Sequence, residues 1–344
     1  MAANTASVNS HNRVKTNFEK VQEFNRAFDM APLEPENYCS YGEDYMGNIH
    51  YNPYKNIRMN LFTDSPKTVK LRLDLIKEEI AELNAAISAV DSIETRDALA
   101  DILYVVYGMA DVFGIDIDSI FKNMIEDNMI QYSHAIQAVD KTIDTAFIQM
   151  AALMKYANSI DNTRYIGLTN YNWVQVQIDI YPSQFLEMKN YKELSSNDIL
   201  PVIQNNINNQ FELLTEFIMG LINSNPNLLS VESIDPCGIM IAELLKWVYC
   251  YTVVGGINVD RDFAIVHDSN MSKLCCSEME AAATVADYQA KFAAGSSPYD
   301  SPYYYYLPNL EKWIVKNRNT GKALKNINYR KVDFLANEIQ SLKV

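Results

Sequence analysis

Apolar residues recur at spacings of three and four along most of the chain, which is the period of one face of an α-helix. Residues 15–29 show the pattern clearly and predict an amphipathic helix. The apolar residues of this stretch are Phe18, Val21, Phe24 and Phe28. Residues 31–60 have no such period, and their Pro, Gly, Asn and Tyr content predicts an irregular connection.

Start and stop signals bound the next helices. The stretch Asp64-Ser65-Pro66 predicts a helix start, since proline is favoured in a first turn, and the apolar period continues to about residue 90. A further helix is predicted from about residue 93 to Phe113, ending at Gly114, and another from Asp118 onwards. Glycine is scarce, with 11 residues in 344, and the sequence therefore predicts an all-α fold.

Two segments depart from the helical period. Residues 313–325, WIVKNRNTGKALK, alternate on both sides of Asn-Thr-Gly and predict a small C-terminal β-hairpin tail, preceded by the aromatic run SPYYYYLP. This run is interpreted as packing against the helical body, with base stacking as the alternative. Residues 160–200 are rich in Asn and Tyr and read as an insertion with one β-like segment, WVQVQIDI.

The chain contains an internal similarity. Residues 107–129 align without a gap on residues 249–271 at an offset of 142, with a shared Gly-Ile-x-x-Asp turn followed by Phe and Asn-Met. The identical pairs include Tyr107/Tyr249, Gly114/Gly256, Asp118/Asp260, Phe121/Phe263 and Asn128/Asn270. We interpret this as a tandem duplication, with a first repeat at 1–140, a second, degenerate repeat at 141–278 and a basic tail at 279–344.

Acidic residues concentrate in the first repeat. Glu78, Glu79 and Glu82 share one side of the predicted helix that starts at Pro66, and Asp97 and Asp101 share one side of the next. The apolar residues around them predict that the two helices pack in one core with the carboxylates at its edge. In the second repeat, two of these five acids have no acidic counterpart: Glu243 aligns with Asp101, and Glu212 and Glu216 can match Glu78 and Glu82, but Leu213 and Ile239 replace Glu79 and Asp97.

Two interpretations of these acids remain open. Most charge runs are solvated faces, and Lys77 and Arg96 are available as ion-pair partners. Like charges three and four residues apart repel one another, however, and a bound divalent cation would relieve the repulsion. Ligands that are all carboxylates favour hard ions, so the predicted metal is Mg²⁺ or Mn²⁺.

Composition and charge exclude several classes of protein. The formal net charge is −14, which argues against general binding to nucleic acids or anionic membranes, although residues 311–344 hold eight Lys or Arg against three acids. The five cysteines lack metal-ligand spacing and predict a reducing, cytoplasmic setting. The polar N-terminus and the absence of a long apolar stretch predict neither a secretory signal nor a membrane span.

At the acidic residues the sequence resembles the all-α nucleoside triphosphate pyrophosphohydrolase superfamily, which includes MazG-type enzymes, phosphoribosyl-ATP pyrophosphohydrolases and dimeric dUTPases. The family pattern E-E-x-x-E is complete as Glu78-Glu79-Ile80-Ala81-Glu82, and Asp101 matches the aspartate of the E-x-x-D pattern. Ala98 occupies the glutamate position of the second pattern, with Asp97 one residue earlier. The stretches LRLDLIKEE, DALADILYVVYG, SNMSKL and TGKALK are most similar to members from phages and large DNA viruses.

The resemblance implies tandem MazG-like four-helix units that form an intramolecular pseudo-dimer. It also implies hydrolysis of the bond between the α- and β-phosphates of nucleoside triphosphates, giving a monophosphate and pyrophosphate. The implied metal ligands are Glu78, Glu79, Glu82, Asp97 and Asp101, with Glu79 as the base that orients water. The predicted substrate contacts are Arg72, Asn128, Asn270, Lys273, Lys322 and Lys325, so one site would take acids from the first repeat and Asn270 and Lys273 from the second.

Two other functions remain open, a nucleotide-binding protein that has lost catalysis and a virion-associated structural protein of the same fold. The expected partners are a nucleoside triphosphate and no stable nucleic acid or membrane. The expected assembly is a monomeric pseudo-dimer or a homodimer, in the host cytoplasm if the protein is viral.

Overall fold

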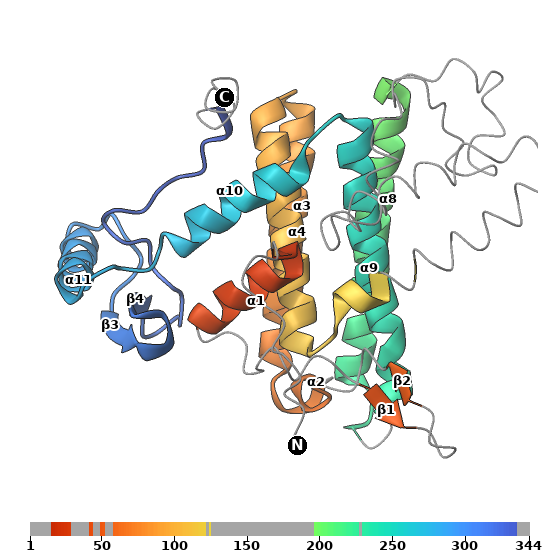
Figure 1. Ribbon diagram of the computed structural model, residues 1–344, viewed down its shortest axis with the longest axis horizontal. Coiled ribbons are helices and arrows are strands. Elements are labelled where there is room, and N and C mark those ends of the chain that lie inside the picture. Colours follow the sequence, from red (N-terminus) through yellow and green to blue (C-terminus); the bar gives the residue numbers. More distant parts are fainter. Residues whose placement is uncertain are drawn as a thin grey trace, which may run out of the picture.

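The computed structural model describes residues 15–28, 41–43, 49–51, 58–121, 124, 196–226 and 229–335. The described part is mostly helical, with four long helices side by side, two shorter helices across them and a small unit at one side (Figure 1). The predicted insertion at 160–200 lies almost wholly outside the described residues, and so does most of the predicted irregular connection at 31–60.

Two antiparallel helix pairs form the central bundle. The first pair is α3 (Pro66–Ser88) and α4 (Ser92–Phe113), and the second is α8 (Ser196–Asn223) and α9 (Val231–Val254). α3 packs on α8, and α4 packs on α9, so the apolar stripes of all four helices meet in one core. The predicted helices that start at Pro66 and near residue 93 are thereby confirmed, whereas most of the helix predicted from Asp118 onwards lies outside the described residues.

The predicted core contacts of α3 and α4 are confirmed except for Leu71 and for Leu75, which is only partly buried. Ile76, Ile80 and Leu83 of α3 are buried, and so are Leu99, Ile102, Leu103 and Val106 of α4. Leu71 was predicted to belong to this core, but it is 54% exposed. Its position lies on the outer side of α3, one residue before the buried Arg72, so the helical period turns it toward solvent.

The ends of α4 are fixed by local chemistry. The side chain of Asp91 accepts hydrogen bonds from the backbone N–H groups of Ile93 and Glu94, which lack partners in the first turn of a helix. Gly114 ends the helix in the left-handed conformation at φ 74°. The same type of ending recurs after α9 at Gly256, where φ is 66°.

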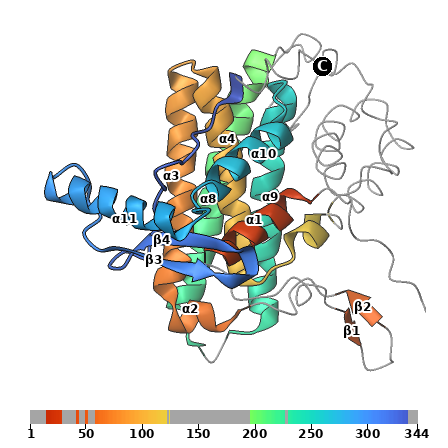
Figure 2. The ribbon, with the colours of Figure 1, turned by 60° about the vertical axis from the view of Figure 1, so that its left-hand side comes forward.

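α1 (Asn17–Ala27) and α10 (Val259–Met271) lie across the bundle and pack on α4 and on each other. α1 begins with a capping box, in which Thr16 and Glu19 satisfy each other's backbone N–H groups. Figure 2 shows α1 and α10 on the face of the bundle that also carries the C-terminal residues. These two helices therefore close one side of the α3–α4 pair.

The C-terminal unit combines α11 (Glu278–Ala293) with a hairpin of β3 (Pro302–Leu307) and β4 (Lys312–Asn317). A two-stranded antiparallel sheet was predicted here, but its strands differ from the prediction. WIVKN pairs with the preceding PYYYYL, whereas the segment after Asn-Thr-Gly forms a single bridge, Lys316 to Ala323. The run of tyrosines has high β-propensity and packs on Trp313, which favours it as the partner strand.

A second short ladder corrects the prediction of a wholly irregular connection at 31–60. β1 (Tyr41–Glu43) pairs with β2 (Ile49–Tyr51) in antiparallel register, with Gly42 opposite His50. The strands have three residues each, which is too short for alternation to be visible in the sequence.

The two helix pairs meet through residues that stand at matching positions when residues 107–129 are aligned on residues 249–271. The hydroxyls of Tyr107 and Tyr249, 142 residues apart, lie 3.1 Å from each other. The ring of Phe263 meets that of Tyr107 edge-on, with 6.0 Å between the ring centroids, and the ring of Phe121 meets that of Tyr249 edge-on, with 6.3 Å between the centroids. Each tyrosine thus contacts the other tyrosine and one of two phenylalanines that are likewise 142 residues apart.

The stretch Ser233–Val254 of α9 is long and apolar enough to cross a membrane, with a mean hydropathy of 1.4. However, 72% of its most apolar part is buried inside the protein. Its apolar character is accounted for by its place in the core of the bundle, where α9 contacts both α8 and α4.

The C-terminal end of α3 contains a strained residue that yields a prediction. Val90 has φ 55° and is 90% exposed, in the position after the helix where glycine is preferred. Because a β-branched side chain disfavours this conformation, Val90→Gly is expected to raise the free energy of unfolding by about 1 kcal/mol. Urea denaturation measures the change.

The neighbouring position provides the matched control for this prediction. Ala89 has φ −81° and needs no left-handed conformation. Ala89→Gly is therefore expected to lower stability by about 0.5–1 kcal/mol. Equal effects of the two glycines would contradict the assignment of strain to Val90.

Candidate functional site

The predicted acidic residues face one another across α3 and α4. The two helices run antiparallel, so the charge of Glu82 acts on Asp97, and that of Glu79 acts on Asp101. Glu78 and Glu82 are exposed, whereas Glu79, Asp97 and Asp101 are partly buried at the edge of the core. The spacing of the acids and the helical pairing together bring carboxylates into one cluster from residues 15 to 23 positions apart in the chain.

Burial and mutual repulsion raise the pKa values of the inner carboxyls. Burial, followed by the charges of Glu82, Glu78 and Asp97, raises the pKa of Glu79 to about 7. Burial, followed by the charges of Glu94, Glu82 and Asp262, raises the pKa of Asp97 to about 6. The pKa of Asp101 is raised well above its ordinary value, first by burial and then by Glu79 and Asp97.

The chemistry of these donors fits a divalent cation. All five are carboxylates, which are ligands that Mg²⁺ prefers, and Oδ1 of Asp97 is buried without a hydrogen-bond partner. Among the residues that the structure describes, however, no three His, Cys, Asp or Glu side chains lie close enough together to hold one ion.

Basic residues from the second half of the chain face this cluster. The ammonium of Lys273, just after α10, acts on Asp101 and is itself affected by Lys325 and Lys322. Burial is the main reason that the pKa of Lys273 is lowered to about 8, with Lys325 next. Nζ of Lys273 donates a 2.6 Å hydrogen bond to Oδ1 of Asn270. Lys273 thus acts directly on the acids, Asn270 is hydrogen-bonded to it, and Lys325 and Lys322 lie near enough to affect its charge.

The remaining two predicted contacts are placed differently. Arg72 is 8% exposed and lies inside the bundle, beside Gly108 and the charge of Asp111. Burial lowers the pKa of Arg72, and Asp111 opposes that shift. Asn128 lies outside the described residues.

Three side chains that lie next to the acids were not predicted from the sequence. The hydroxyl of Tyr104 lies 3.1 Å from Nδ1 of His267, and Nε2 of His267 lies 3.7 Å from Oε2 of Glu23. Tyr104 follows Asp101 by three residues and His267 precedes Asn270 by three, so helical spacing placed both beside predicted site residues. No other feature of the sequence distinguishes His267 from the remaining histidines.

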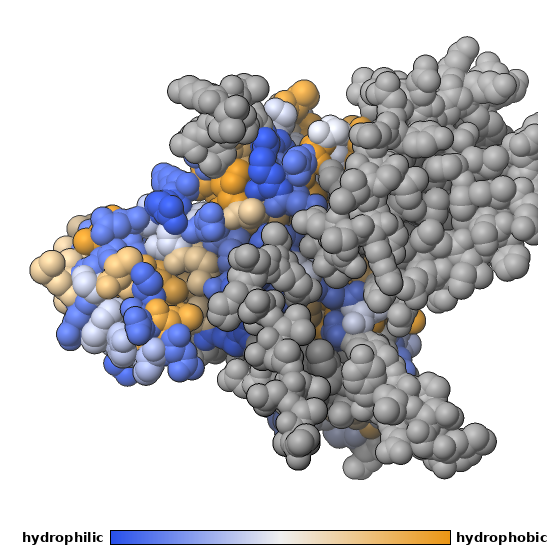
Figure 3. Space-filling model, viewed as in Figure 1, coloured by the Kyte–Doolittle hydropathy of each residue, from blue (hydrophilic) through white to orange (hydrophobic). Residues whose placement is uncertain are grey.

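The C-terminal residues reach the same face. The hydroxyl of Ser269 donates to the backbone carbonyl of Arg330 at 2.8 Å, and the ring of Phe334 lies 4.8 Å from the guanidinium of Arg96. The residues after β4 therefore run along α10 to the start of α4, as the ribbon shows (Figure 1). Hydrophilic residues cover much of this face, with smaller hydrophobic patches over the C-terminal unit (Figure 3).

The acid of the second half that aligns with Asp101 has an internal partner. Glu243 forms an ion pair with Lys246, three residues later, and Lys246 is 5% exposed. At the offset of 142, Lys246 corresponds to Tyr104. An ammonium of the chain itself therefore neutralises this carboxylate.

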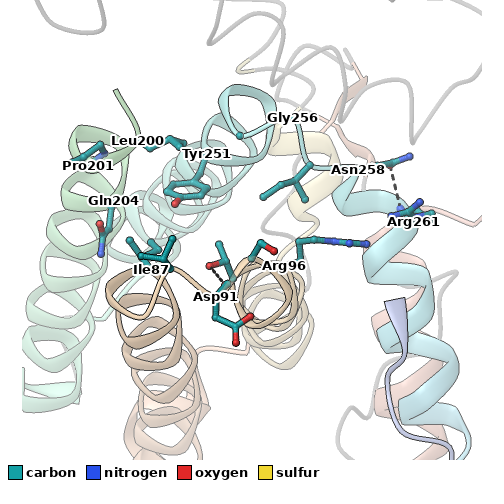
Figure 4. Close-up of a pocket in the computed structure, with 15 residues that line it drawn as sticks. Ile87, Asp91, Arg96, Leu200, Pro201, Gln204, Tyr251, Gly256, Asn258 and Arg261 are labelled. Carbon is teal, nitrogen blue, oxygen red and sulfur yellow. Dashed lines mark hydrogen bonds between the residues drawn. The ribbon is translucent and has the colours of Figure 1, made fainter. Parts of the chain in front are cut away.

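A cavity of about 680 Å³ lies at the end of the bundle near the α3–α4 turn. Figure 4 shows Tyr251, Gln204 and Ile87 around it, with Arg96 and Arg261 at the side of α10. Arg96 donates two hydrogen bonds to Asp262, of 2.8 and 2.7 Å, and Asp262 contributes to the raised pKa of Asp97. This ion pair connects the wall of the cavity to the acidic cluster.

Comparison with known proteins locates a family within the first half. Residues 52–128 match the phosphoribosyl-ATP pyrophosphohydrolase family, and this segment contains all five clustered acids. An uncharacterized protein of Acanthamoeba polyphaga mimivirus is 27% identical over 320 residues, which are 93% of this chain and 94% of that protein. No solved structure matches.

The raised pKa of Glu79 predicts a pH dependence of stability. A carboxyl with a pKa of about 7 when folded and 4.5 when unfolded holds its proton longer in the folded state. Its contribution to stability is therefore greatest below about 4.5 and is lost as the pH rises to about 7. Glu79→Gln removes this loss and is expected to stabilise the protein at pH 8 by on the order of 1–3 kcal/mol.

Urea denaturation in EDTA at pH 5 and pH 8 measures this difference. Asp74→Asn, an exposed acid one turn earlier on α3, is the control and is expected to change stability by less than about 0.5 kcal/mol. A Glu79→Gln variant with the same pH dependence as the unaltered chain would contradict the assigned pKa.

Proposed function

The family match at residues 52–128 and the mimivirus relative support a nucleoside triphosphate pyrophosphohydrolase-like superfamily for this chain, and we propose that it hydrolyses nucleoside triphosphates between the α- and β-phosphates. The observation that carries the proposal is the carboxylate cluster between α3 and α4, with Lys273 directed at Asp101. Carboxylates that could bind a cation and an ammonium that could bind phosphate then lie next to each other.

Within this proposal the cation is Mg²⁺ or Mn²⁺, held by Glu78, Glu79, Glu82, Asp97 and Asp101. When bound, such an ion polarises phosphate oxygens and neutralises the charge that develops on the leaving pyrophosphate. Burial first, and repulsion between neighbouring carboxylates second, raise the pKa values of Glu79 and Asp97, and it is the repulsion that would favour uptake of a cation.

Glu79 is the proposed general base. Its carboxylate lies at the proposed reacting centre, where it can accept a proton from the attacking water and release it afterwards. The oxygen of that water forms a new bond to phosphorus as the bond to the bridging oxygen breaks. The products are a nucleoside monophosphate and pyrophosphate, and the proton passes to Glu79.

Lys273, Lys322 and Lys325 are the proposed phosphate contacts. The ammonium groups of Lys325 and Lys322 repel that of Lys273. A bound triphosphate would reduce this repulsion, just as a bound cation would reduce the repulsion among the acids. Asn270 orients Lys273 through its hydrogen bond. Asn128 is retained as a prediction from the sequence, and Arg72 would act on the substrate only through the packing of α3.

We further propose that the two halves derive from an internal duplication, with a first repeat at 1–140, a degenerate repeat at 141–278 and the tail from 279. The reciprocal contacts of Tyr107, Tyr249, Phe121 and Phe263 support this pseudo-dimer. The Glu243–Lys246 ion pair supports a single working site, because the acid of the second half is already neutralised. The chain would then act as a monomer in the cytoplasm, of the host if it is viral.

A nucleotide-binding protein without catalysis is the second candidate. Ala98 in place of a family glutamate, and the absence among the described residues of three acidic, His or Cys side chains close enough to ligate an ion, favour it. Binding of a triphosphate without release of pyrophosphate would identify this case.

A turnover assay tests the proposed activity. With Mg²⁺ and a panel of ribo- and deoxynucleoside triphosphates, we expect pyrophosphate and monophosphate in equal amounts. Glu79→Gln and Asp101→Asn are expected to lower kcat/KM on the order of 100-fold or more, because each removes a charge from the reacting centre. Glu212→Gln, an exposed acid of α8, is the control and is expected to retain turnover. Full activity of both site variants would refute the site.

The contribution of the second half is tested separately. Lys273→Met removes the ammonium next to Asp101 and is expected to raise KM about tenfold or more, since a charged hydrogen bond to phosphate is lost. Lys291→Met alters an exposed lysine on α11 and is expected to leave KM unchanged. A Lys273→Met variant that loses thermal stability but keeps kcat/KM would contradict the shared site.

A further inference from the structure

A continuous series of polar contacts runs from α1 through α10 and α4 to the acidic cluster. Oε2 of Glu23 lies 3.7 Å from Nε2 of His267, and Nδ1 of His267 lies 3.1 Å from the hydroxyl of Tyr104. The side chain of Asn270 forms a hydrogen bond with Tyr104. Oδ1 of Asn270 also accepts a 2.6 Å hydrogen bond from Nζ of Lys273. The last member, Lys273, faces Asp101.

The middle of this series is enclosed by packing. Tyr104 is 6% exposed and His267 is 8% exposed. The ring of Tyr104 stacks on Phe263 at 5.3 Å and meets Phe24 edge-on at 5.4 Å. With its ring fixed on both sides, Tyr104 has little freedom to move its hydroxyl, and a buried hydroxyl is costly without partners.

The chemistry of each group fixes the direction of the donors. An ammonium only donates, so Oδ1 of Asn270 accepts from Lys273 and the amide N–H₂ remains to donate to the oxygen of Tyr104. The hydroxyl hydrogen of Tyr104 is then directed to Nδ1 of His267. This leaves the imidazole proton on Nε2, on the side of Glu23.

We propose that Tyr104 and His267 are positioning residues that hold Asn270, and through it Lys273, in place for a phosphate of the nucleotide. The inference rests on the proposed function and adds two residues to its site. Neither touches the substrate; each acts through the orientation of the Asn270 amide.

The need for such positioning follows from the surroundings of Lys273. A lysine side chain is flexible and loses considerable rotamer entropy when it is held in one conformation. Lys325 and Lys322 repel the ammonium of Lys273, while Asp101 attracts it. The ring of Phe24, 5.6 Å from Nζ, and Oδ1 of Asn270 hold it between these groups. Fixing the amide therefore fixes the ammonium.

Tyr104→Phe tests the inference, with Tyr107→Phe as the matched control. Both tyrosines are buried in α4 one turn apart, but the hydroxyl of Tyr107 meets Tyr249 instead of His267. Tyr104→Phe is expected to lower kcat/KM about tenfold, mainly through KM, whereas Tyr107→Phe keeps both constants. Equal kinetic effects of the two variants would overturn the inference.

A double-mutant cycle separates positioning from a structural role. If Tyr104 acts through Lys273, Tyr104→Phe has no further effect on KM in a Lys273→Met background. Additive effects in the cycle would overturn the inference while leaving the proposed function intact. The same cycle is read in the Kd for a triphosphate measured by calorimetry, so the test does not require turnover.

His267 provides the second variant. His267→Asn keeps an acceptor for the Tyr104 hydroxyl and is expected to retain a lower KM than His267→Leu, which has none. Equal KM values for two folded variants would overturn the role of His267. If the unaltered chain neither hydrolyses nor binds a nucleotide, the proposed function is overturned, and this inference with it.

Discussion

Apolar packing of α3 on α4 forces like charges together at the edge of the core. Ile76, Ile80 and Leu83 lock one helix on the other, and the period that buries them places Glu79 opposite Asp101. The protein thus carries repulsion that its own hydrophobic contacts maintain. Burial and this repulsion together raise the pKa values of Glu79 and Asp97, and a bound cation would reduce the repulsion.

The face opposite these acids comes from distant parts of the chain. α10 brings Asn270 and the following Lys273 to the cluster, and the residues after β4 bring Lys322 and Lys325 near Lys273. The residues after β4 are joined to α10 by the hydroxyl of Ser269, and Phe334 contacts Arg96. The acids and Lys273 therefore belong to separate segments, and the distance between them depends on how α10 packs across α4.

Local features of the fold could be predicted from the sequence, because helix periods, Pro66 and Gly114 act over a few residues. The proximity of the five acids could be predicted because all five lie on two consecutive helices. The strand partner of WIVKN was assigned wrongly, since the turn after it competes with the run of tyrosines before it. His267 could not be assigned because its partners, Tyr104 and Glu23, are more than 160 residues away in the chain.

The hydroxyl pair of Tyr107 and Tyr249 has a consequence for how the molecule changes over time. In an assembly of two identical chains, any substitution at such a contact appears twice. Here the two tyrosines are encoded by separate codons, so one can mutate while the other stays, and the side chain of Asn17 already bonds to Tyr249. A single polypeptide can thus specialise each side of the contact independently.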